Sequence, residues 1–351
     1  MKKLFNPTIL TIILVIIVQL ASGQADHKNQ PGKTFRIAFY NVENLFDTID
    51  DPETNDADFL PDARIPWTAE RYEVKLSHLA EVIHALSEPQ AIAIMGLCEI
   101  ENKMVLEDLV SSPQIIPYRY QVIHHDSPDE RGIDNAMLYD AEQFQPLSMR
   151  NIPVILPGQP EDRTRDILYV KGLSRKVKSD TLHIFVNHWP SRSEGKEISE
   201  PKRIIAAETL KAVTDSLFSR NPLALIVIMG DFNDEPSDKS ITEGLKAMPP
   251  AEKPACKELY NLMDPLYRQG KGTLYYKDWD LFDQVIISGS FWNKEKGVIF
   301  SGKEGKIFEA DWLLFKTDEG TLRPNRTAAK EYYGGYSDHL PIYVDLLFKK
   351  Y

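Results

Sequence analysis

Eight short apolar runs, rich in β-branched residues, recur along the chain and constrain its fold more than any other feature. Each run has the length of a β-strand and is bounded by polar or turn-forming residues. The runs are Phe35–Tyr40, Ala91–Cys98, Asn135–Tyr139, Ile167–Val170, Leu182–Val186, Leu223–Met229, Val285–Ile287 and Ile342–Leu347. A chain with so many strands buries much of its apolar surface against β-sheet, and we therefore predict a fold built on sheets.

Two segments between these runs have the periodicity of amphipathic helices. Each places its apolar side chains on one stripe, at intervals of three and four residues. The two stripes are Tyr72, Leu76, Leu79, Ile83 and Leu86, and Ala206, Leu210, Val213 and Leu217. Pro201 stands near the start of the second helix, where proline is tolerated. Because a helix with one apolar face must cover another layer, we predict two sheets packed face to face with helices outside.

No internal repeat, linker or break in composition divides the chain, and we predict that 35–351 is one domain. The whole chain has 351 residues, enough for a full hydrophobic core. Two long segments, Asp47–Pro66 and Pro236–Tyr260, are rich in Asp, Glu and Pro. They are interpreted either as surface loops over a site or as solvated insertions.

Residues 1–23 have the pattern of a signal peptide. Two lysines precede an uncharged apolar run, Ile9–Leu20, and the small residues Ala21-Ser22-Gly23 follow it. The run is shorter than the about 20 residues of a comfortable membrane span, although an uncleaved anchor is the alternative. We therefore predict an exported protein, secreted or periplasmic, with a flexible segment at 24–34.

The charge and cysteine content limit the chemistry that the chain can carry. Its formal net charge is −11, the opposite sign to that of a protein that binds nucleic acid through bulk positive charge. Phosphate chemistry would therefore need a local cation, from a few arginines or from a bound metal. The two cysteines exclude a disulfide scaffold and a CxxC site. Cys98 and Cys256 can pair in an exported protein, but Cys98 lies in an apolar run and is interpreted first as a small core residue.

Polar residues gather where the predicted strands begin or end. Taken singly, such residues are common turn formers. Together they form a recurring set of carboxylates, amides and two histidines: Asn41, Glu43, Glu99, His188, Asp231, Asn233, Asp283, Asp338 and His339. Residues that separate strands carry to one rim of a sheet can converge in a single site. We therefore expect one site built from these strand termini.

The donor types in this set suit a hard cation. Oxygen ligands with no thiolate and few histidines favour Mg²⁺ or Mn²⁺, with Glu99 as the best single ligand candidate. Asp231 and Asn233 lie two residues apart on an extended segment and therefore face the same side. One can orient a water molecule while the other holds a phosphate oxygen, and nearby histidines can donate to a phosphoryl oxygen or protonate a leaving group. The set predicts metal-assisted hydrolysis of a phosphoester.

The ordered motifs resemble those of the endonuclease/exonuclease/phosphatase superfamily, which has the DNase I-like fold. The matching stretches are Phe39-Tyr40-Asn41-Val42-Glu43-Asn44, Gly96-Leu97-Cys98-Glu99, Val186-Asn187-His188-Trp189, Met229-Gly230-Asp231-Phe232-Asn233, Phe282-Asp283-Gln284 and Ser337-Asp338-His339-Leu340-Pro341. Order and spacing match over about residues 35–347. The resemblance implies an α/β (α+β) four-layer sandwich in which two packed mixed β-sheets are flanked by helices.

The same resemblance implies roles for individual residues. The metal and phosphate environment would comprise Glu99, Asn41 and Asp338, with Glu43 as a further candidate for metal contact. The catalytic residues would be Asp231, which activates the attacking water, Asn233, which positions the phosphate, His188 and His339, which stabilise charge or assist the leaving group, and Asp283, which fixes the tautomer of His339. Arg165, at the start of a strand, would contact this network.

Three other segments have alternative interpretations. The loop Pro190-Ser191-Arg192-Ser193 either brings Arg192 to a phosphate or is simply exposed. The segment His124-His125-Asp126 resembles a metal cluster but is better explained as a loop or strand end, because adjacent residues on a strand point to opposite faces. Asn325-Arg326-Thr327 fits a glycosylation sequon.

The function expected from this sequence is that of an exported, metal-dependent phosphodiesterase with Mg²⁺ or Mn²⁺ as cofactor. Its expected substrate is nucleic acid, cleaved as by an endonuclease acting on DNA or RNA. Two alternatives stay open: a phosphoesterase of the same fold that acts on a phospholipid or an inositol phosphate, and a non-catalytic surface-binding module. The sequence indicates no obligate protein partner.

Overall fold

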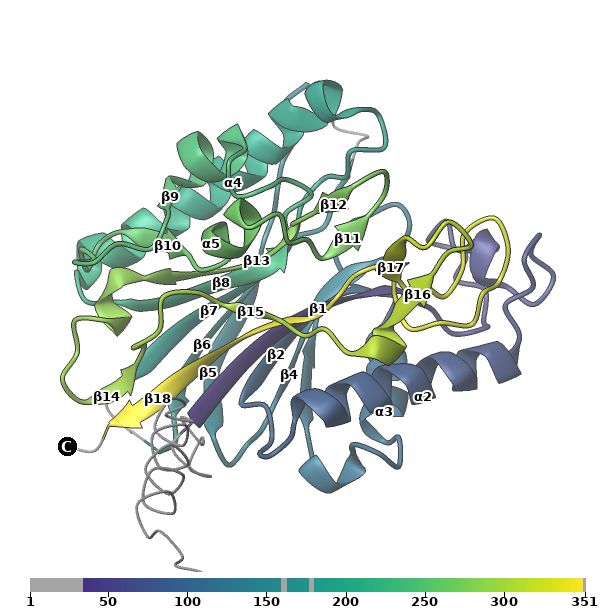
Figure 1. Ribbon diagram of the computed structural model, residues 1–351, viewed down its shortest axis with the longest axis horizontal. Helices are drawn as coiled ribbons and strands as arrows, with labels where there is room; N and C mark the ends of the chain where they lie inside the picture. The colour runs from purple at the N-terminus through teal and green to yellow at the C-terminus, as the bar shows by residue number, and fades with distance from the viewer. Residues whose placement is uncertain (1–33, 159–162, 177–179, 350–351) are drawn as a thin grey trace, which may run out of the picture.

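Two seven-stranded sheets face each other across a shared apolar layer (Figure 1). In this computed structural model, residues 34–158, 163–176 and 180–349 are described. The predicted signal peptide and the segment 24–33 lie outside the described residues, and Thr34 already belongs to the first strand. Within the described residues, no helix is both long and apolar enough to cross a lipid bilayer.

The first sheet mixes parallel and antiparallel neighbours. Its strands, in spatial order, are β14 (Gly297–Ile299), β18 (Ile342–Lys349), β1 (Thr34–Leu45), β2 (Ile94–Ile100), β4 (Asp134–Tyr139) and β3 (Gln121–His124), and β15 (Lys306–Ile307) also pairs with β18. The central pair, β1 and β2, is parallel, and the other pairs are antiparallel. Both central strands are buried on both faces, as near-continuous apolar runs require.

The second sheet repeats this plan. Its strands, in spatial order, are β5 (Phe144–Ile152), β6 (Ile167–Ser174), β7 (Thr181–His188), β8 (Leu225–Asp231), β13 (Asp283–Ser288), β10 (Leu259–Asn261) and β9 (Ala247–Met248). The pair β7 and β8 is parallel, and β8 and β13 are antiparallel. The short strand β10 is parallel to β9, which lies at the edge of the sheet. Each of the eight strands predicted from the sequence overlaps an observed strand, and the predicted fold class is confirmed.

Helices cover the outer face of each sheet. The first sheet carries α2 (Ala69–Leu86) and α3 (Lys103–Val110), and the second carries α4 (Lys196–Arg220) and the π-helical turn η3 (Ser240–Leu245) (Figure 1). The side chain of Thr68 accepts a hydrogen bond from the N–H of Arg71 and so caps α2. Pro201 lies in the second turn of α4, close to its start as predicted. The molecule thus has three apolar layers, one between the sheets and one under each set of helices.

Smaller elements decorate this frame. They are the short helix α5 (Asp264–Arg268), the hairpins β11 (Leu274–Tyr275)–β12 (Trp279–Asp280) and β16 (Leu314–Lys316)–β17 (Leu322–Pro324), and the 3₁₀ turns η1 (Ala57–Phe59), η2 (Ile116–Tyr118), η4 (Gly289–Phe291) and η5 (Asp311–Leu313). Cys98 is buried and Cys256 is partly exposed, and both are free thiols. The disulfide that export would permit is therefore not formed.

A buried ion pair fixes the segment that follows β8. Arg203 of α4 is fully buried, and its Nε lies 2.7 Å from Oδ1 of Asp234. The same carboxylate pairs with Arg192 at 2.9 Å and accepts a hydrogen bond from the hydroxyl of Ser240 at 2.6 Å. These contacts tie the outer helix to the loop after β8. They hold that loop in place against the sheet.

Gly230 on β8 lies where the neighbouring strand β7 leaves no space for a side chain. A Cβ on this residue would overlap the carbonyl oxygen and Cβ of Asn187 on the neighbouring strand. We expect Gly230→Ala to lower the free energy of unfolding by about 1–3 kcal/mol, because the strands must move apart to admit the methyl group. Urea unfolding of both proteins measures the change. An unaltered midpoint would contradict the overlap.

His183 on β7 makes the stability depend on pH. Its Nδ1 lies 2.7 Å from the hydroxyl of Tyr169, and burial, with a smaller effect of Lys171, lowers its pKa from 6.5 to about 4. Between pH 6.5 and about pH 4, His183 is protonated in the unfolded chain but neutral in the folded chain. The free energy of unfolding therefore falls as the pH drops through this range. We expect His183→Gln to lose less stability than the parent between pH 7 and pH 4.5, by on the order of 1 kcal/mol. Equal losses in both proteins would contradict this expectation.

Candidate active site

The strand register brings the polar termini of both sheets to one edge. Asn41 on β1 is opposite Cys98 on β2, one residue before Glu99. In the second sheet Asp231 at the end of β8 is opposite both His188 on β7 and Asp283 on β13. Because parallel strands end at the same edge of a sheet, these side chains meet where the two sheets meet.

Asn41 lies at the centre of this cluster. Its side-chain nitrogen donates to Oδ2 of Asp231 at 3.0 Å and to Oε1 of Glu99 at 3.2 Å, and lies 3.5 Å from Nε2 of His339. Its side-chain oxygen accepts a hydrogen bond from the N–H of Glu43 at 3.0 Å. The amide therefore presents a donor to the cluster. The expected place of Asn41 in the metal and phosphate environment stays a prediction.

His339 and Asp283 form a buried pair. Nδ1 of His339 lies 2.7 Å from Oδ2 of Asp283, the contact that the motif resemblance implied. Burial alone would lower the pKa of His339, but the charges of Asp283 and Asp231 outweigh it and raise the pKa well above 6.5. The two carboxylates therefore favour the protonated form of the imidazole, whose Nε2 lies 3.8 Å from Oδ2 of Asp231.

Asp231 is positioned by backbone as well as side chains. Its Oδ1 accepts a hydrogen bond from the N–H of Asn233 at 2.9 Å, and the side chain of Asn233 donates to the carbonyl of Trp189 at 3.0 Å. Burial raises the pKa of Asp231 from 3.8 to about 6; the charge of His339 opposes this rise and that of Asp283 adds to it. A carboxylate of this kind can accept a proton near neutral pH.

His188 faces the same cluster from β7. Its Nε2 lies 3.7 Å from Oδ2 of Asp231 and 3.9 Å from Oε1 of Glu99, too far for hydrogen bonds. Burial and, to a smaller extent, the charges of Arg165 and Arg131 lower its pKa well below 6.5. Burial therefore favours the neutral form of the His188 imidazole, whose Nε2 faces the two carboxylates without bonding to either.

Glu43 and Asp338 flank the cluster and share one guanidinium. Arg326 contacts Oε1 of Glu43 through Nε at 3.0 Å and Oδ2 of Asp338 through Nη2 at 2.9 Å. Burial and the charge of Asp338 raise the pKa of Glu43 to about 7. Lys75 of α2 is buried behind them and donates to the hydroxyl of Thr327 and, at 2.8 Å, to the carbonyl of Tyr336.

The backbone is strained at this cluster. Six non-glycine residues in the described chain have positive φ, and four of them, Glu43, Asn44, Glu99 and Asn233, belong to the cluster or adjoin it. A positive φ at a non-glycine residue costs conformational energy, which the surrounding structure must offset. For Glu99 the carboxylate accepts a hydrogen bond from the N–H of Asn44 at 2.9 Å, which fixes its direction.

The structure places the two predicted arginines behind the cluster. Arg165 bonds Oδ2 of Asp129 at 3.1 Å and the carbonyl of Trp189 at 2.7 Å, so it supports the segment that carries His188. Arg192 pairs with Asp234 and Asp238 and packs on Phe282, 4.4 Å from the ring centroid. Both guanidinium groups bond to the protein, and the contact with the phosphate network expected for Arg165 and Arg192 stays a prediction.

Three cationic residues near the cluster escaped the sequence analysis. Arg326 was interpreted only as the middle of a glycosylation sequon, Lys75 lies among apolar helix positions, and Arg131 donates to the side-chain oxygen of Asn44. Nothing local marks them, because the residues they contact are mostly far away in sequence. The one usable signal was the charged Lys75 beside the apolar stripe of a helix that packs on the sheet.

A second group, His124, Asp126 and Asp134, also has metal-ligating types. Oδ2 of Asp134 lies 2.9 Å from Nε2 of His124, and its Oδ1 accepts a hydrogen bond from the N–H of Ser127 at 2.7 Å. The carboxylate is thus used to close the loop between β3 and β4. This agrees with the interpretation of His124 as a strand-end residue.

The donor set fits a divalent cation. Asp231 and Glu43 are held with pKa values of about 6 and 7 by burial, while Asp283 and Asp338 add repulsion to each. A cation near Glu99 would relieve this repulsion, and only oxygen and imidazole donors are present, as hard cations prefer. One metal-sized group among the described residues is formed by Asp231, Asp283 and His339.

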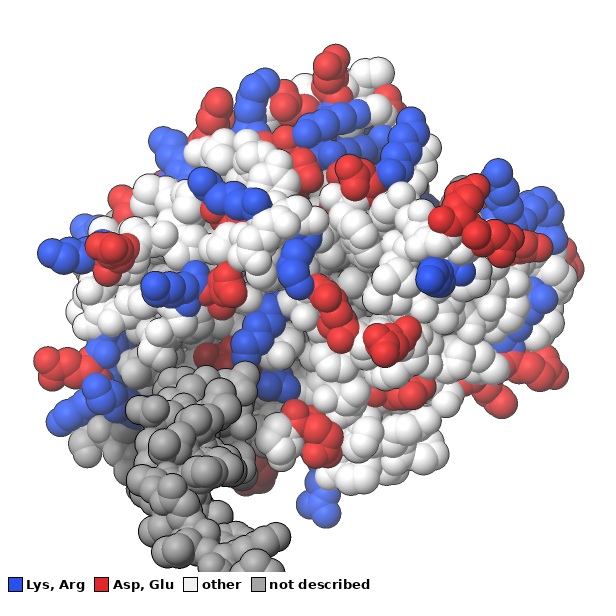
Figure 2. Space-filling model, in the orientation of Figure 1, with Lys and Arg blue, Asp and Glu red and all other residues white. Residues whose placement is uncertain are grey.

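The charged side chains on the face seen in Figure 2 do not mark a phosphate-binding surface. On the face seen in Figure 2, basic and acidic side chains are interspersed among uncharged ones, without an extended field of one sign. The net charge of −11 is therefore not offset by a basic surface on this face. Any phosphate must be bound by local groups, as the composition indicates.

Comparison with solved structures finds the same fold. A truncated TDP2 from Caenorhabditis elegans is 13% identical, with a TM-score of 0.55 over 90% of this chain and 98% of that one. A mannosyl-6-phosphatase from Bacteroides thetaiotaomicron is 16% identical, with a TM-score of 0.54 over 90% of this chain and 100% of that one. The catalytic domain of human nocturnin is 15% identical, with a TM-score of 0.52 over 90% and 95%. No match was found among curated proteins.

Fold and cluster together define a hydrolase that acts on phosphoester bonds. A family model described as "Endonuclease/Exonuclease/phosphatase family" matches residues 36–348. The chain belongs to this family, and the predicted resemblance is confirmed.

Proposed function

We propose that this chain is an exported phosphodiesterase that uses a divalent cation, Mg²⁺ or Mn²⁺, to hydrolyse nucleic acid. The observation that carries the proposal is the convergence of His188, Asp231 and His339 around the amide of Asn41. Nε2 of His188 and Nε2 of His339 then lie 3.7 and 3.8 Å from the same oxygen, Oδ2 of Asp231. Together these groups can activate a water molecule for attack on a phosphorus atom and stabilise the negative charge that develops.

The residues of the cluster divide the chemistry between them. Asp231, with its raised pKa of about 6, orients the attacking water and takes its proton. His339, held as a cation by Asp283, and His188 donate to the phosphoryl oxygens as negative charge grows on them. The amide of Asn41 supplies a further donor. Glu99, with Asp338 and Glu43 as further candidates, would hold the cation, which when bound would supply positive charge to polarise a phosphoryl oxygen and stabilise the leaving oxyanion.

Export is part of the proposal because of the N-terminal sequence. Two lysines, an apolar run and small residues at 21–23 form the pattern of a cleaved signal peptide. N-terminal sequencing of the protein recovered from the source cells checks this point. A new N-terminus near residue 24 is the expected result, and an intact Met1 would contradict it.

Nucleic acid is proposed as the substrate for two reasons. The family to which the chain belongs includes endonucleases and exonucleases by its description. In addition, the exposed Arg131 lies beside the cluster, next to Asn44, where its guanidinium can meet a phosphate next to the one that is cleaved. The similar mannosyl-6-phosphatase and the inositol-phosphate and phospholipid alternatives make a direct comparison of substrates necessary.

A substrate panel tests the proposal. The purified protein is incubated with Mg²⁺ or Mn²⁺ and plasmid DNA, single-stranded DNA, RNA, bis-p-nitrophenyl phosphate, sphingomyelin and inositol phosphates. We expect cleavage of nucleic acid and of bis-p-nitrophenyl phosphate, loss of activity in EDTA, and recovery when the metal is returned. Activity that survives exhaustive EDTA would remove the metal from the proposal. Cleavage of sphingomyelin or inositol phosphate alone would replace the substrate.

A further inference from the structure

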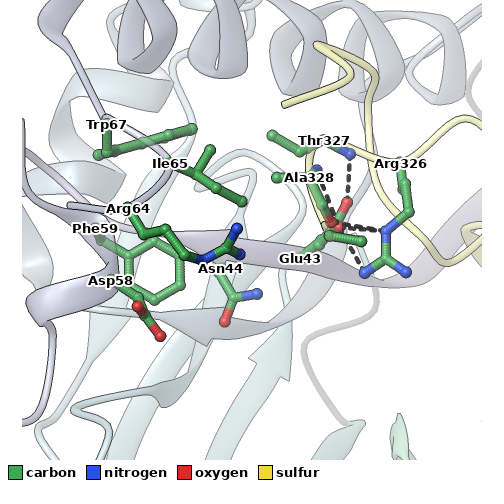
Figure 3. A pocket seen from close by; sticks show the side chains of 11 residues that line it. Glu43, Asn44, Asp58, Phe59, Arg64, Ile65, Trp67, Arg326, Thr327 and Ala328 are labelled. Carbon is green, nitrogen blue, oxygen red and sulfur yellow. Dashed lines mark hydrogen bonds and ion pairs between the residues drawn. The ribbon is translucent and has the colours of Figure 1, made fainter. Parts of the chain in front are cut away.

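A pocket of about 250 Å³ opens directly beside the cluster (Figure 3). Glu43 and Arg326, which flank the cluster, form one wall, and the segment after β1 forms the other. Asn44, whose N–H holds the Glu99 carboxylate, lies between the two walls. A phosphate bound at the cluster would therefore place its attached group at the mouth of this pocket.

One wall carries an aromatic ring that is already fixed in place. Phe59 of η1 stacks on Phe46 with ring centroids 4.0 Å apart and planes 6° apart. Phe46 is buried, whereas Phe59 is half-buried and lines the pocket. A flat ring entering the pocket can stack on Phe59 without any loss of side-chain freedom there.

The same wall carries a guanidinium with little bonding of its own. Arg64 is exposed, and its guanidinium points across the pocket towards Asn44 and Glu43 (Figure 3). Its hydrogen bond goes to the carbonyl of Lys330 at 3.2 Å, and among the described residues no carboxylate lies within ion-pair distance of it. Asp58 also lines the pocket but does not pair with it. Arg64 is thus available to an anionic group of a ligand.

The combination identifies the kind of group that fits. An aromatic platform and an unpaired guanidinium, next to a phosphate site, match a nucleotide, which offers a flat base and an adjoining phosphate. The pocket has room for one ring system, so a base that remains paired with a complementary strand cannot enter. The pocket therefore selects for unpaired nucleotides.

We propose, on the basis of the proposed function, that this pocket binds one unpaired nucleotide adjacent to the scissile phosphate. Its base stacks on Phe59, and its neighbouring phosphate contacts Arg64. The substrate class that follows is single-stranded DNA or RNA, or the frayed end of a duplex, rather than an intact double helix.

Substrates with one base removed test the proposal without altering the protein. Single-stranded oligonucleotides with one cleavable linkage are compared with versions that carry an abasic residue on the 5′ or the 3′ side of that linkage, and with the same strand in a duplex. We expect the abasic residue on one side to raise KM roughly 5- to 150-fold, the range expected for the loss of one stacked base, with kcat less affected. Equal KM values for all strands would overturn the proposal.

Variants then assign the effect to the two side chains. Phe59→Ala and Arg64→Gln are expected to raise KM for the intact single strand, and Phe59→Ala to have no further effect on the abasic strand. Phe59→Leu, which keeps apolar bulk over Phe46, guards against loss of folding in the alanine variant. Matched controls are Phe315→Ala and Arg323→Gln, which remove the same side-chain types from the exposed hairpin β16–β17.

The two levels of the proposal fail in different ways. If the wild-type protein cleaves neither bis-p-nitrophenyl phosphate nor nucleic acid, the proposed function fails and the pocket proposal with it. If it cleaves nucleic acid, yet Phe59→Ala and Arg64→Gln match their controls and duplex is cleaved as well as single strand, only the pocket proposal fails.

Discussion

Replacement of His339 by alanine is expected to lower the turnover of a phosphodiester by about 10²–10³-fold. Nδ1 of the imidazole lies 2.7 Å from Oδ2 of Asp283, and the charges of Asp283 and Asp231 favour the protonated form of the ring. A preorganised charged donor of this kind acts mainly in the transition state, so kcat should fall while KM changes little. Steady-state kinetics on bis-p-nitrophenyl phosphate measure both quantities.

The comparison needs a folded variant and a matched histidine. The alanine variant leaves the buried Asp283 carboxylate without its partner, so its melting temperature should fall, and circular dichroism must show that it is folded at the assay temperature. His84→Ala, which removes an exposed histidine from α2, serves as the control and should keep wild-type turnover. A His339→Ala variant with most of its activity would remove His339 from the chemistry.

Glu99→Gln is expected to abolish the response to metal as well as most of the activity. The change keeps the size of the side chain and removes the charge that would bind the cation, so the loss at millimolar Mg²⁺ should be at least about 10²-fold. Metal that binds only the folded protein stabilises it, and the wild-type melting temperature should therefore rise on addition of Mg²⁺ or Mn²⁺. The variant should show a much smaller rise.

Differential scanning fluorimetry and kinetics across a metal titration give these two readouts. Glu107→Gln on α3 is the matched control, since its carboxylate is exposed and, among the described residues, pairs only with Lys103. A Glu99→Gln variant with the wild-type metal dependence in both assays would contradict the assignment of Glu99 as a metal ligand. Activity lost with an unchanged metal-induced shift would assign Glu99 to another step.

The sequence predicted the buried strands well and the edge strands poorly. Strands such as β1 and β8 are buried on both faces and so appear as continuous apolar runs. β5 was not predicted: it is the edge strand of its sheet, its middle is exposed, and it contains Pro146, which interrupts the ladder with β6. A strand with one neighbour and an open surface has no composition that distinguishes it from a loop.

The candidate site could be predicted only as far as strand termini determine it. Asn41, Glu99, His188 and Asp231 lie at the ends of parallel pairs, and the pairing alone brings them together. The ion pair between Glu43 and Arg326, by contrast, joins residues that lie 283 positions apart in the sequence. The sequence predicted no partner in the protein for the guanidinium of Arg192, but in the fold this group pairs with the carboxylates of Asp234 and Asp238. Which residues form these ion pairs depends on how the loops pack, and no local sequence pattern predicts loop packing.

Because the site is divided between the two sheets, the catalytic activity depends strongly on the position of one sheet relative to the other. Asn41 and Glu99 come from one sheet, and His188 and Asp231 from the other. A sliding of the layers by about 1 Å would leave every strand intact and yet misalign water, phosphate and acid, which is enough to cost orders of magnitude in rate. Substitutions deep in the shared apolar layer, far from any phosphate, can therefore silence the enzyme without unfolding it.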